Sequence, residues 1–189
     1  MQITTSALSV FRDCPRKYYY MFELKRVPIK EDIKLKFGQV LHQFLEQYWK
    51  HEDNIDLRNN ISNLEPKDIA KLWAMVTHYS PPWQDYHVEA TEEEFELKID
   101  KNRMLLGKID LLLKCKKDGK IYIVDHKHTT NEIIGFGPYW HALEIDNQMR
   151  NYTISYRSDG FIYDVLKKPN IRPSKEDEKV AHSKDISVM

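Results

Sequence analysis

Length, composition and charge narrow the possibilities before any motif is considered. The chain has 189 residues, of which 41% are hydrophobic and 12% aromatic, enough to fill one core and too apolar for a disordered chain. Its 29 basic and 29 acidic residues cancel to a formal net charge of zero, which argues against nucleic-acid binding through a uniformly basic surface.

The first half of the chain is predicted to be mainly helical. Residues 5–24 favour an interrupted helix, because Pro15 starts a new turn inside it. A charged connector over 26–36 precedes the clearest helix, 37–51. Its apolar residues recur at helical spacing: Phe37, Val40, Leu41, Phe44, Leu45, Tyr48 and Trp49. Residues 66–79 predict a further helix.

The second half is predicted to form a sheet. Apolar residues alternate over 94–99, as in a strand. Two further strands, 104–115 and 120–126, are joined by a turn that contains Asp-Gly. A helix over 139–157 and a strand over 160–166 follow. This order indicates a mixed α/β sheet flanked by helices.

The organisation of the chain is expected to be simple. We expect one domain over 1–168, with a helical part over about 1–85 packed on the sheet core, and a polar tail over 169–189. No apolar run approaches the roughly 18 residues of a membrane span, and no secretory signal is evident. The two cysteines form no CxxC pair, so a reducing, cytoplasmic setting is expected.

Three charged residues on the predicted hairpin suggest a site. If four residues form the loop, Asp110 lies opposite Asp125; a two-residue loop places it opposite Lys127. In both registers the three side chains share one face. Directly opposed residues have Cβ atoms about 4.5–5.5 Å apart. Two carboxylates that close repel each other, and a hard divalent cation with oxygen ligands is their natural partner.

A structural ion pair is the alternative reading of these residues. An acidic residue followed two positions later by Lys occurs seven times in the chain, so the tripeptide alone is uninformative. The segment Asp125–His126–Lys127 differs because it ends an apolar run and has a second acidic residue on the adjoining strand.

Several sequence blocks, in this order, resemble the PD-(D/E)XK nuclease superfamily. Within it they are most similar to RecB-type exonuclease domains, including the CRISPR-associated and phage ones. The blocks are Ser6–Tyr18 (the family's S…F…CPRKY), Phe37–His42 (G-x-x-x-H), Gly107–Asp110 (G-x-x-D), Val124–Lys127 (D-x-K) and Gln148–Tyr152 (Q-x-x-x-Y). The resemblance covers about residues 5–166 and implies a restriction-endonuclease-like mixed β-sheet flanked by helices.

The resemblance also implies an activity and its residues. It implies a divalent-metal-dependent nuclease that hydrolyses DNA phosphodiester bonds, an exonuclease acting on single strands or ends in repair, recombination or phage DNA processing. The implied ligands of Mg²⁺ or Mn²⁺ are His42, Asp110, Asp125 and the main-chain carbonyl of His126. Lys127 would position or deprotonate the attacking water, and Gln148 and Tyr152 would hold the substrate strand or orient Lys127.

Candidate nucleic-acid contacts surround this set: Arg16, Lys17, Lys36, Gly38 and Arg150. Each has a bland alternative. His42 is also read as a packed histidine, Gly38 as a helix-start glycine, and Gln148 with Tyr152 as a structural hydrogen bond. Beside Arg16 and Lys17, the tyrosines at 18–20 are favoured as buried rings over base-stacking ones.

The cysteines of the chain depart from the pattern of the family that it resembles. Many RecB-type relatives bind an iron–sulfur cluster through four cysteines. Cys14 matches the first of these, the other three are missing and Cys115 does not match. We therefore expect no such cluster, and we expect Cys14 to be a small core residue.

Two further functions stay open at this point. One is a catalytically silent DNA-binding or assembly module that keeps the nuclease fold, and the other is a phosphohydrolase for small nucleotides. Segment charges bear on the substrate: the net charge is +4 over 1–50, −8 over 51–100 and +3 over 101–150. A neutral chain can thus present a basic cleft, so we expect local, salt-sensitive binding of DNA, in the cytoplasm of a bacterium or phage-infected host. Neither a partner protein nor an oligomeric state is predicted.

Overall fold

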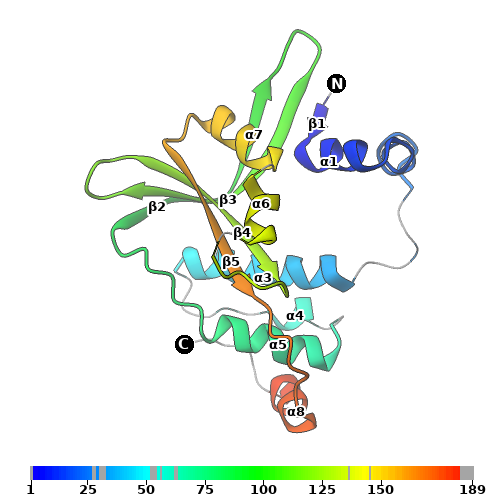
Figure 1. Cartoon of the computed structure of the whole chain (residues 1–189), viewed down its shortest axis with the longest axis vertical. Helices are drawn as coiled ribbons and strands as arrows, with labels where there is room; N and C mark the ends of the chain where they lie inside the picture. The colour runs from blue at the N-terminus through cyan, green and yellow to red at the C-terminus, as the bar shows by residue number, and fades with distance from the viewer. Residues whose placement is uncertain are drawn as a thin grey trace.

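After a short first strand, helices precede a strand meander, and two helices and a last strand follow it (Figure 1). The sequence predicts this order of helices and meander, with one helix over 139–157 in place of the two. The computed structural model describes residues 2–26, 29, 33–51, 55, 57–61, 64–135, 137–144 and 146–183. Its elements are β1 (Gln2–Thr4), α1 (Thr5–Asp13), α2 (Pro15–Tyr18), the π-helical turn η1 (Tyr19–Glu23), α3 (Ile33–Trp49), α4 (Arg58–Ile61), α5 (Pro66–Val76), β2 (Tyr86–Lys98), β3 (Met104–Cys115), β4 (Ile121–Thr129), α6 (Pro138–Glu144), α7 (Asn147–Tyr156), β5 (Gly160–Lys167) and α8 (Lys175–Ser183).

Strand β3 is the centre of the mixed sheet. Strand β2 pairs with it in antiparallel fashion over its whole length. Because β2 occupies one edge of β3, the parallel strand β1 and the antiparallel strand β4 must share the other edge. Strand β1 pairs with residues 104–106 and β4 with residues 111–114. Residues 107–110 of β3 therefore lie in a gap between β1 and β4, where β3 and β4 diverge (Figure 1).

The register of the β3–β4 hairpin decides between the two predicted loops. The N–H of Cys115 donates to the carbonyl of Lys120 at 2.9 Å, and the ladder runs to the pair Leu111–Val124. This is the four-residue loop, and it makes Asp110 and Asp125 the first opposed residues beyond the ladder.

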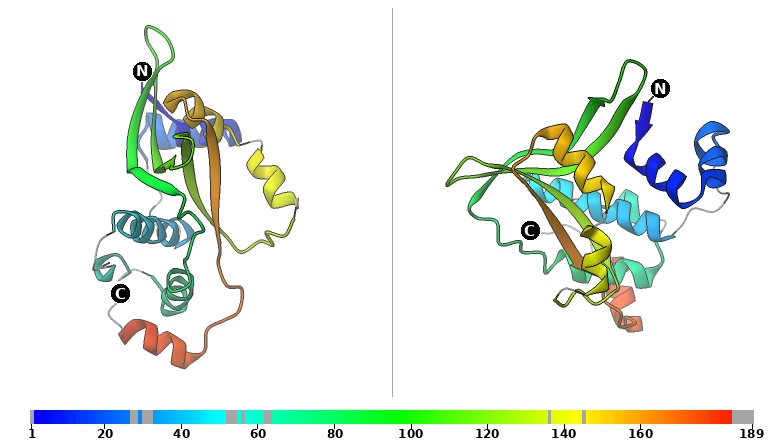
Figure 2. Two further views of the ribbon diagram at one scale, coloured as in Figure 1. Left: turned by 90° about the vertical axis from the view of Figure 1, so that its left-hand side faces the viewer. Right: turned by 45° about the horizontal axis from the view of Figure 1, so that its top comes forward.

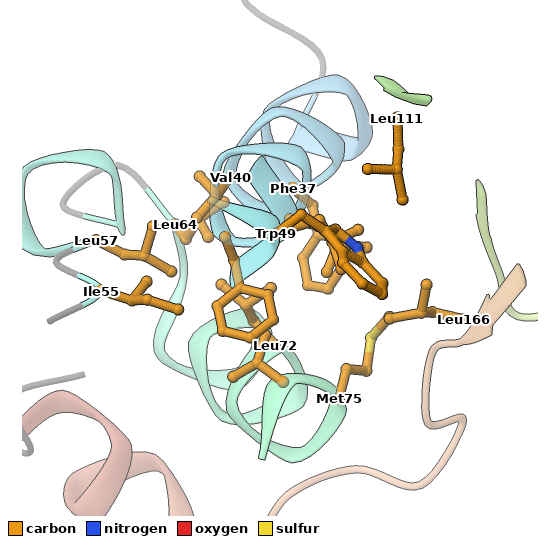
Figure 3. Close-up of a cluster of buried hydrophobic side chains, with 14 of the residues drawn as sticks. Phe37, Val40, Trp49, Ile55, Leu57, Leu64, Leu72, Met75, Leu111 and Leu166 are labelled. Atoms are coloured by element: carbon orange, nitrogen blue, oxygen red, sulfur yellow. The ribbon is translucent and has the colours of Figure 1, made fainter. Parts of the chain in front are cut away.

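Two apolar clusters cover the two faces of the sheet. The larger lies between α3, α5 and the sheet. Figure 3 shows Phe37, Val40 and Trp49 of α3 near Leu72 and Met75 of α5. The smaller cluster lies on the other face, where α7 contributes Tyr152 (Figure 2).

Strand β3 changes its facing near Asp110. Ile109 belongs to the smaller cluster, yet Leu111 belongs to the larger one. A strictly alternating strand would place both side chains on one face. Leu112, two residues after Asp110, shares the smaller cluster with Ile123, two residues before Asp125. This is consistent with the predicted common face of Asp110 and Asp125. The alternation of β3 on which that prediction relied is interrupted at Asp110.

The N-terminal block forms three short elements. The Thr4 hydroxyl caps α1 by accepting from the Ala7 N–H at 3.1 Å, and the Cys14 Sγ accepts from the Lys17 N–H at 3.4 Å. Cys14 is exposed, so its prediction as a core residue is wrong. The thiol caps α2, whose first residue is Pro15, and an N-cap side chain has to stay at the end of its helix.

Three other boundaries differ from the sequence-based prediction. The single helix over 139–157 is divided into α6 and α7, because Asp146 caps α7 by accepting from the Gln148 N–H at 2.9 Å. Strand β2 begins at Tyr86, before the predicted 94–99. The alternating pattern missed its first part, because a register shift between Val88 and Ala90 interrupts the alternation there. Helix α8 lies in the predicted polar tail and packs against α5.

Candidate metal centre

The gap between β1 and β4 brings His42 and Asp110 together. Helix α3 presents His42, whose Nδ1 lies 3.5 Å from Asp110 Oδ1. The other carboxylate oxygen of Asp110 accepts from the main-chain N–H of His126 at 2.8 Å. The Asp110 carboxylate is thus held by His42 and by the His126 N–H. The predicted metal ligand at His126 is its main-chain carbonyl, and that role stays a prediction.

The ionisation of this pair is set by two opposing effects. Burial disfavours charge on both groups. The hydrogen bond and charge of Asp110 outweigh burial for His42, so the pKa of His42 is raised. In the same way, His42 and the His126 N–H outweigh burial for Asp110 and hold the pKa of that carboxyl below its usual range.

A second group is built around Asp125, on the α7 side of the gap. Asp125 is 1% exposed, and its Oδ1 accepts from Gln148 Nε2 at 2.8 Å. The Nζ of Lys127 lies 2.5 Å from Asp125 Oδ2 and donates to Gln148 Oε1 at 3.0 Å. Gln148 Nε2 also donates to the Tyr152 hydroxyl at 2.9 Å.

Burial and charge set the ionisation of Asp125. Burial raises the pKa of Asp125 to about 6, with Lys127 opposing the shift and Asp110 adding to it. Its Oδ2 has no aligned hydrogen bond, although the ion pair with Lys127 is short. Oδ2 is thus held by its ion pair with Lys127, and Oδ1 by Gln148. A buried carboxylate of this kind offers oxygen atoms that suit a hard cation.

Glu92 completes a group that sequence reasoning missed. One possible ligand atom from each of His42, Glu92 and Asp110 lies within 4.8 Å of the others. Strand β2 carries Glu92 opposite Asp110, between the pairs Thr91–Leu111 and Glu93–Ile109. No sequence signal identified it, because it sits in a run of glutamates outside every motif block.

A series of hydrogen bonds links His126 to side chains of β5, α3 and the segment after α5. Asp164 on β5 accepts from the Tyr79 hydroxyl at 2.8 Å, and its Oδ2 lies 2.8 Å from His126 Nδ1. Trp49 Nε1 in turn donates to the Tyr79 hydroxyl at 3.2 Å. Asp164 lies opposite His126 in the β4–β5 register. In the sequence, Asp164 is an acidic residue inside the apolar run 161–166, and this could have marked it as a site residue.

The predicted nucleic-acid contacts are scattered. Gly38 faces the ring of His128, whose Cε1 would lie 3.1 Å from an added Cβ, so its lack of a side chain makes room for that ring. Lys36 lies on α3, partly buried, and Arg150 on α7, exposed.

Arg16 and Lys17 are exposed on α2. The Arg16 guanidinium lies 5.8 Å from the centroid of the Tyr20 ring. Tyr19 is 51% and Tyr20 37% exposed. The interpretation of these two rings as buried is therefore wrong, because η1 turns them away from the sheet.

A groove connects the N-terminal helix to the centre. Thr5, Leu8, Ser9 and Arg12 of α1 line it with Asp146, Gln148 and Asn151, and it encloses about 240 Å³. Gln148 takes part in both the groove and the Asp125 group.

Comparison with known proteins gives this arrangement a family. A search of the curated proteins found no match. Among solved structures, one described as "Crystal structure of SSO0001" is 15% identical, with a TM-score of 0.46 over 95% of this chain and 71% of that one. The model of the PD-(D/E)XK nuclease superfamily matches residues 2–176. That match spans the gap in the sheet and every side chain of the metal centre, and the chain belongs to the PD-(D/E)XK nuclease superfamily.

Proposed function

We propose that the protein is a divalent-metal-dependent exonuclease that hydrolyses DNA, acting on single strands or ends. The observation that carries this proposal is that Asp110 and Asp125 directly follow the last pair of the β3–β4 ladder, with Lys127 paired to Asp125. The family match supports a metal-dependent nuclease. The DNA substrate, the exonuclease mode and a role in repair, recombination or phage DNA processing go beyond it.

His42, Asp110 and Asp125 would hold the cation, with the carbonyl of His126. When bound, Mg²⁺ or Mn²⁺ supplies Lewis acidity to the phosphoryl group and to water. Oxygen ligands suit both ions, and a histidine ligand favours manganese. The buried carboxylate of Asp125 and a His–Asp pair held by the backbone are a suitable donor set.

Lys127 carries the remaining positive charge at the centre. Its Nζ contacts both Asp125 Oδ2 and Gln148 Oε1, so the position of the ammonium group is restricted. An ammonium held there can position the attacking water and stabilise charge on the phosphoryl oxygens as it develops. Tyr152 holds Gln148 by accepting from its Nε2, which keeps Gln148 Oε1 turned to Lys127.

A single strand is the substrate that the surroundings favour. Gln148 is one of the residues that line the groove between α1 and α7. On the N-terminal block, Tyr19 and Tyr20 are partly exposed and the Arg16 guanidinium lies over the Tyr20 ring. Exposed rings and cations together suit unpaired bases and their phosphates.

Degradation of labelled DNA tests the proposal. Linear and circular DNA, single- and double-stranded, are incubated with Mg²⁺, Mn²⁺ or EDTA. We expect loss of linear but not circular DNA, no reaction in EDTA, and no reaction for Asp125→Ala or Lys127→Ala. Lys120→Ala is the matched control, since Lys120 lies at the exposed end of the same hairpin and pairs with Asp118.

Other outcomes would overturn the proposal. Cleavage by Asp125→Ala or Lys127→Ala at the wild-type rate would show that the reaction takes place elsewhere. Cleavage of circular DNA would make the protein an endonuclease. Metal-independent DNA binding without cleavage would instead favour the silent module, and turnover of nucleotides alone would favour the phosphohydrolase.

A further inference from the structure

Glu92 has an unusual backbone for its place in the middle of a long strand. Its φ is +53°, in the left-handed region that residues other than glycine rarely adopt. The flanking residues Thr91 and Glu93 pair regularly with β3, so the distortion is confined to one residue. That residue lies opposite Asp110, where β3 itself changes its facing.

The distortion places a third carboxylate in the row that crosses the centre. Strand β2 carries Glu92 on one side of Asp110, and β4 carries Asp125 on the other. The Glu92 side chain is 16% exposed, and one of its oxygens belongs to the group within 4.8 Å that includes His42 and Asp110. Three carboxylates so arranged need positive charge between them.

Lys108 supplies part of that charge. Its Nζ lies 2.5 Å from Glu92 Oε2, while its side chain is 51% exposed. A half-exposed lysine can leave such a pair when a stronger cation replaces it, because water then solvates its ammonium. A divalent cation between Glu92 and Asp110 would neutralise the carboxylate more fully.

We propose that Glu92 is a ligand of the metal ion and exchanges its ion pair with Lys108 for the cation when the metal binds. This inference rests on the proposed function, since it concerns the same metal centre. It adds a ligand from β2, a strand outside every motif block of the sequence. It also gives the distortion of β2 at Glu92 a purpose.

Binding of Mn²⁺ alone, without substrate, tests the proposal. Free Mn²⁺ is followed by electron paramagnetic resonance as it is titrated into the full chain. We expect Glu92→Gln to weaken the affinity about 10-fold or more, because even the outer-shell partners of metal ligands typically contribute this much. Glu96→Gln, at an exposed position of the same strand, is the matched control and should bind like the wild type.

Two further variants separate the ligand role from folding and from Lys108. Glu92→Gly suits the left-handed backbone, so it should fold at least as well as the wild type and still lose Mn²⁺ affinity. Lys108→Met should tighten Mn²⁺ binding, because the competing cation is gone. This gain should vanish when Glu92→Gln is also present.

The results distinguish this inference from the proposed function. If Asp110→Asn loses Mn²⁺ while Glu92→Gln binds like the wild type, Glu92 is not a ligand and the proposed centre stands. If Asp110→Asn also binds Mn²⁺ normally, the centre itself is misplaced. Unchanged or weaker binding by Lys108→Met would overturn the exchange.

Discussion

The substitution Asp125→Asn should stabilise the metal-free protein at neutral pH while removing its function. Burial raises the pKa of Asp125 from 3.8 to about 6, so the folded chain binds this proton more tightly than the unfolded chain does. The stabilisation from protonation is present in full below about pH 4 and is lost as the pH rises through 6. A difference of about two pKa units corresponds to about 3 kcal/mol. Asparagine cannot ionise and avoids that loss.

Urea unfolding in EDTA at pH 4 and pH 8 measures this effect. The free energy of unfolding of Asp125→Asn, relative to wild type, should rise by up to about 3 kcal/mol between the two pH values. The substitution also removes the ion pair of Lys127 with Asp125, although Lys127 keeps Gln148 as a hydrogen-bond acceptor. Any part of this loss that does not depend on pH cancels when the two pH values are compared. A difference between the two proteins that does not change from pH 4 to pH 8 would refute the reasoning.

Three further substitutions test separate parts of the structure. Lys127→Ala should lower the single-turnover rate of hydrolysis by about 100-fold or more, yet leave Mn²⁺ binding measured by paramagnetic resonance intact; loss of binding would make Lys127 a support of the ligands instead. Gly107→Ala should cost about 1–3 kcal/mol of stability in urea, because an added Cβ would lie 2.2 Å from the Phe95 ring; an unchanged midpoint would show that the ring moves aside freely. Tyr79→Phe removes the hydrogen bond to Asp164 and should lower the free energy of unfolding by roughly 1 kcal/mol, and a neutral result would mean that water replaces the hydroxyl.

Local patterns explain why much of the fold could be predicted. The helical spacing of apolar residues predicted α3 and α5 within a few residues of their observed ends. Hairpin register follows from loop length, and the sequence allows a four-residue and a two-residue loop, so only the structure places Asp110 opposite Asp125. Charged residues at the ends of apolar strands identified Asp125 and Lys127, and the structure joins them to Gln148.

The missed features depend on contacts between distant parts of the chain. Pairing of β1 with residues 104–106 joins segments about a hundred residues apart, and three residues of sequence carry no strand signal. The position of the Glu92 side chain depends on a left-handed backbone, which a glutamate in a sequence does not predict. Asp164 became recognisable only when β5 placed it beside His126 and Tyr79.

Within the described residues, no helix is both long and apolar enough to cross a bilayer.

Anomalous scattering from crystals grown with Mn²⁺ tests the central claim most directly. We predict one strong peak with oxygen atoms of both Asp110 and Asp125 at about 2.0–2.6 Å, beside a nitrogen of His42. A peak bound elsewhere, or one that contacts neither carboxylate, would contradict the assignment of the metal centre to the gap between β1 and β4.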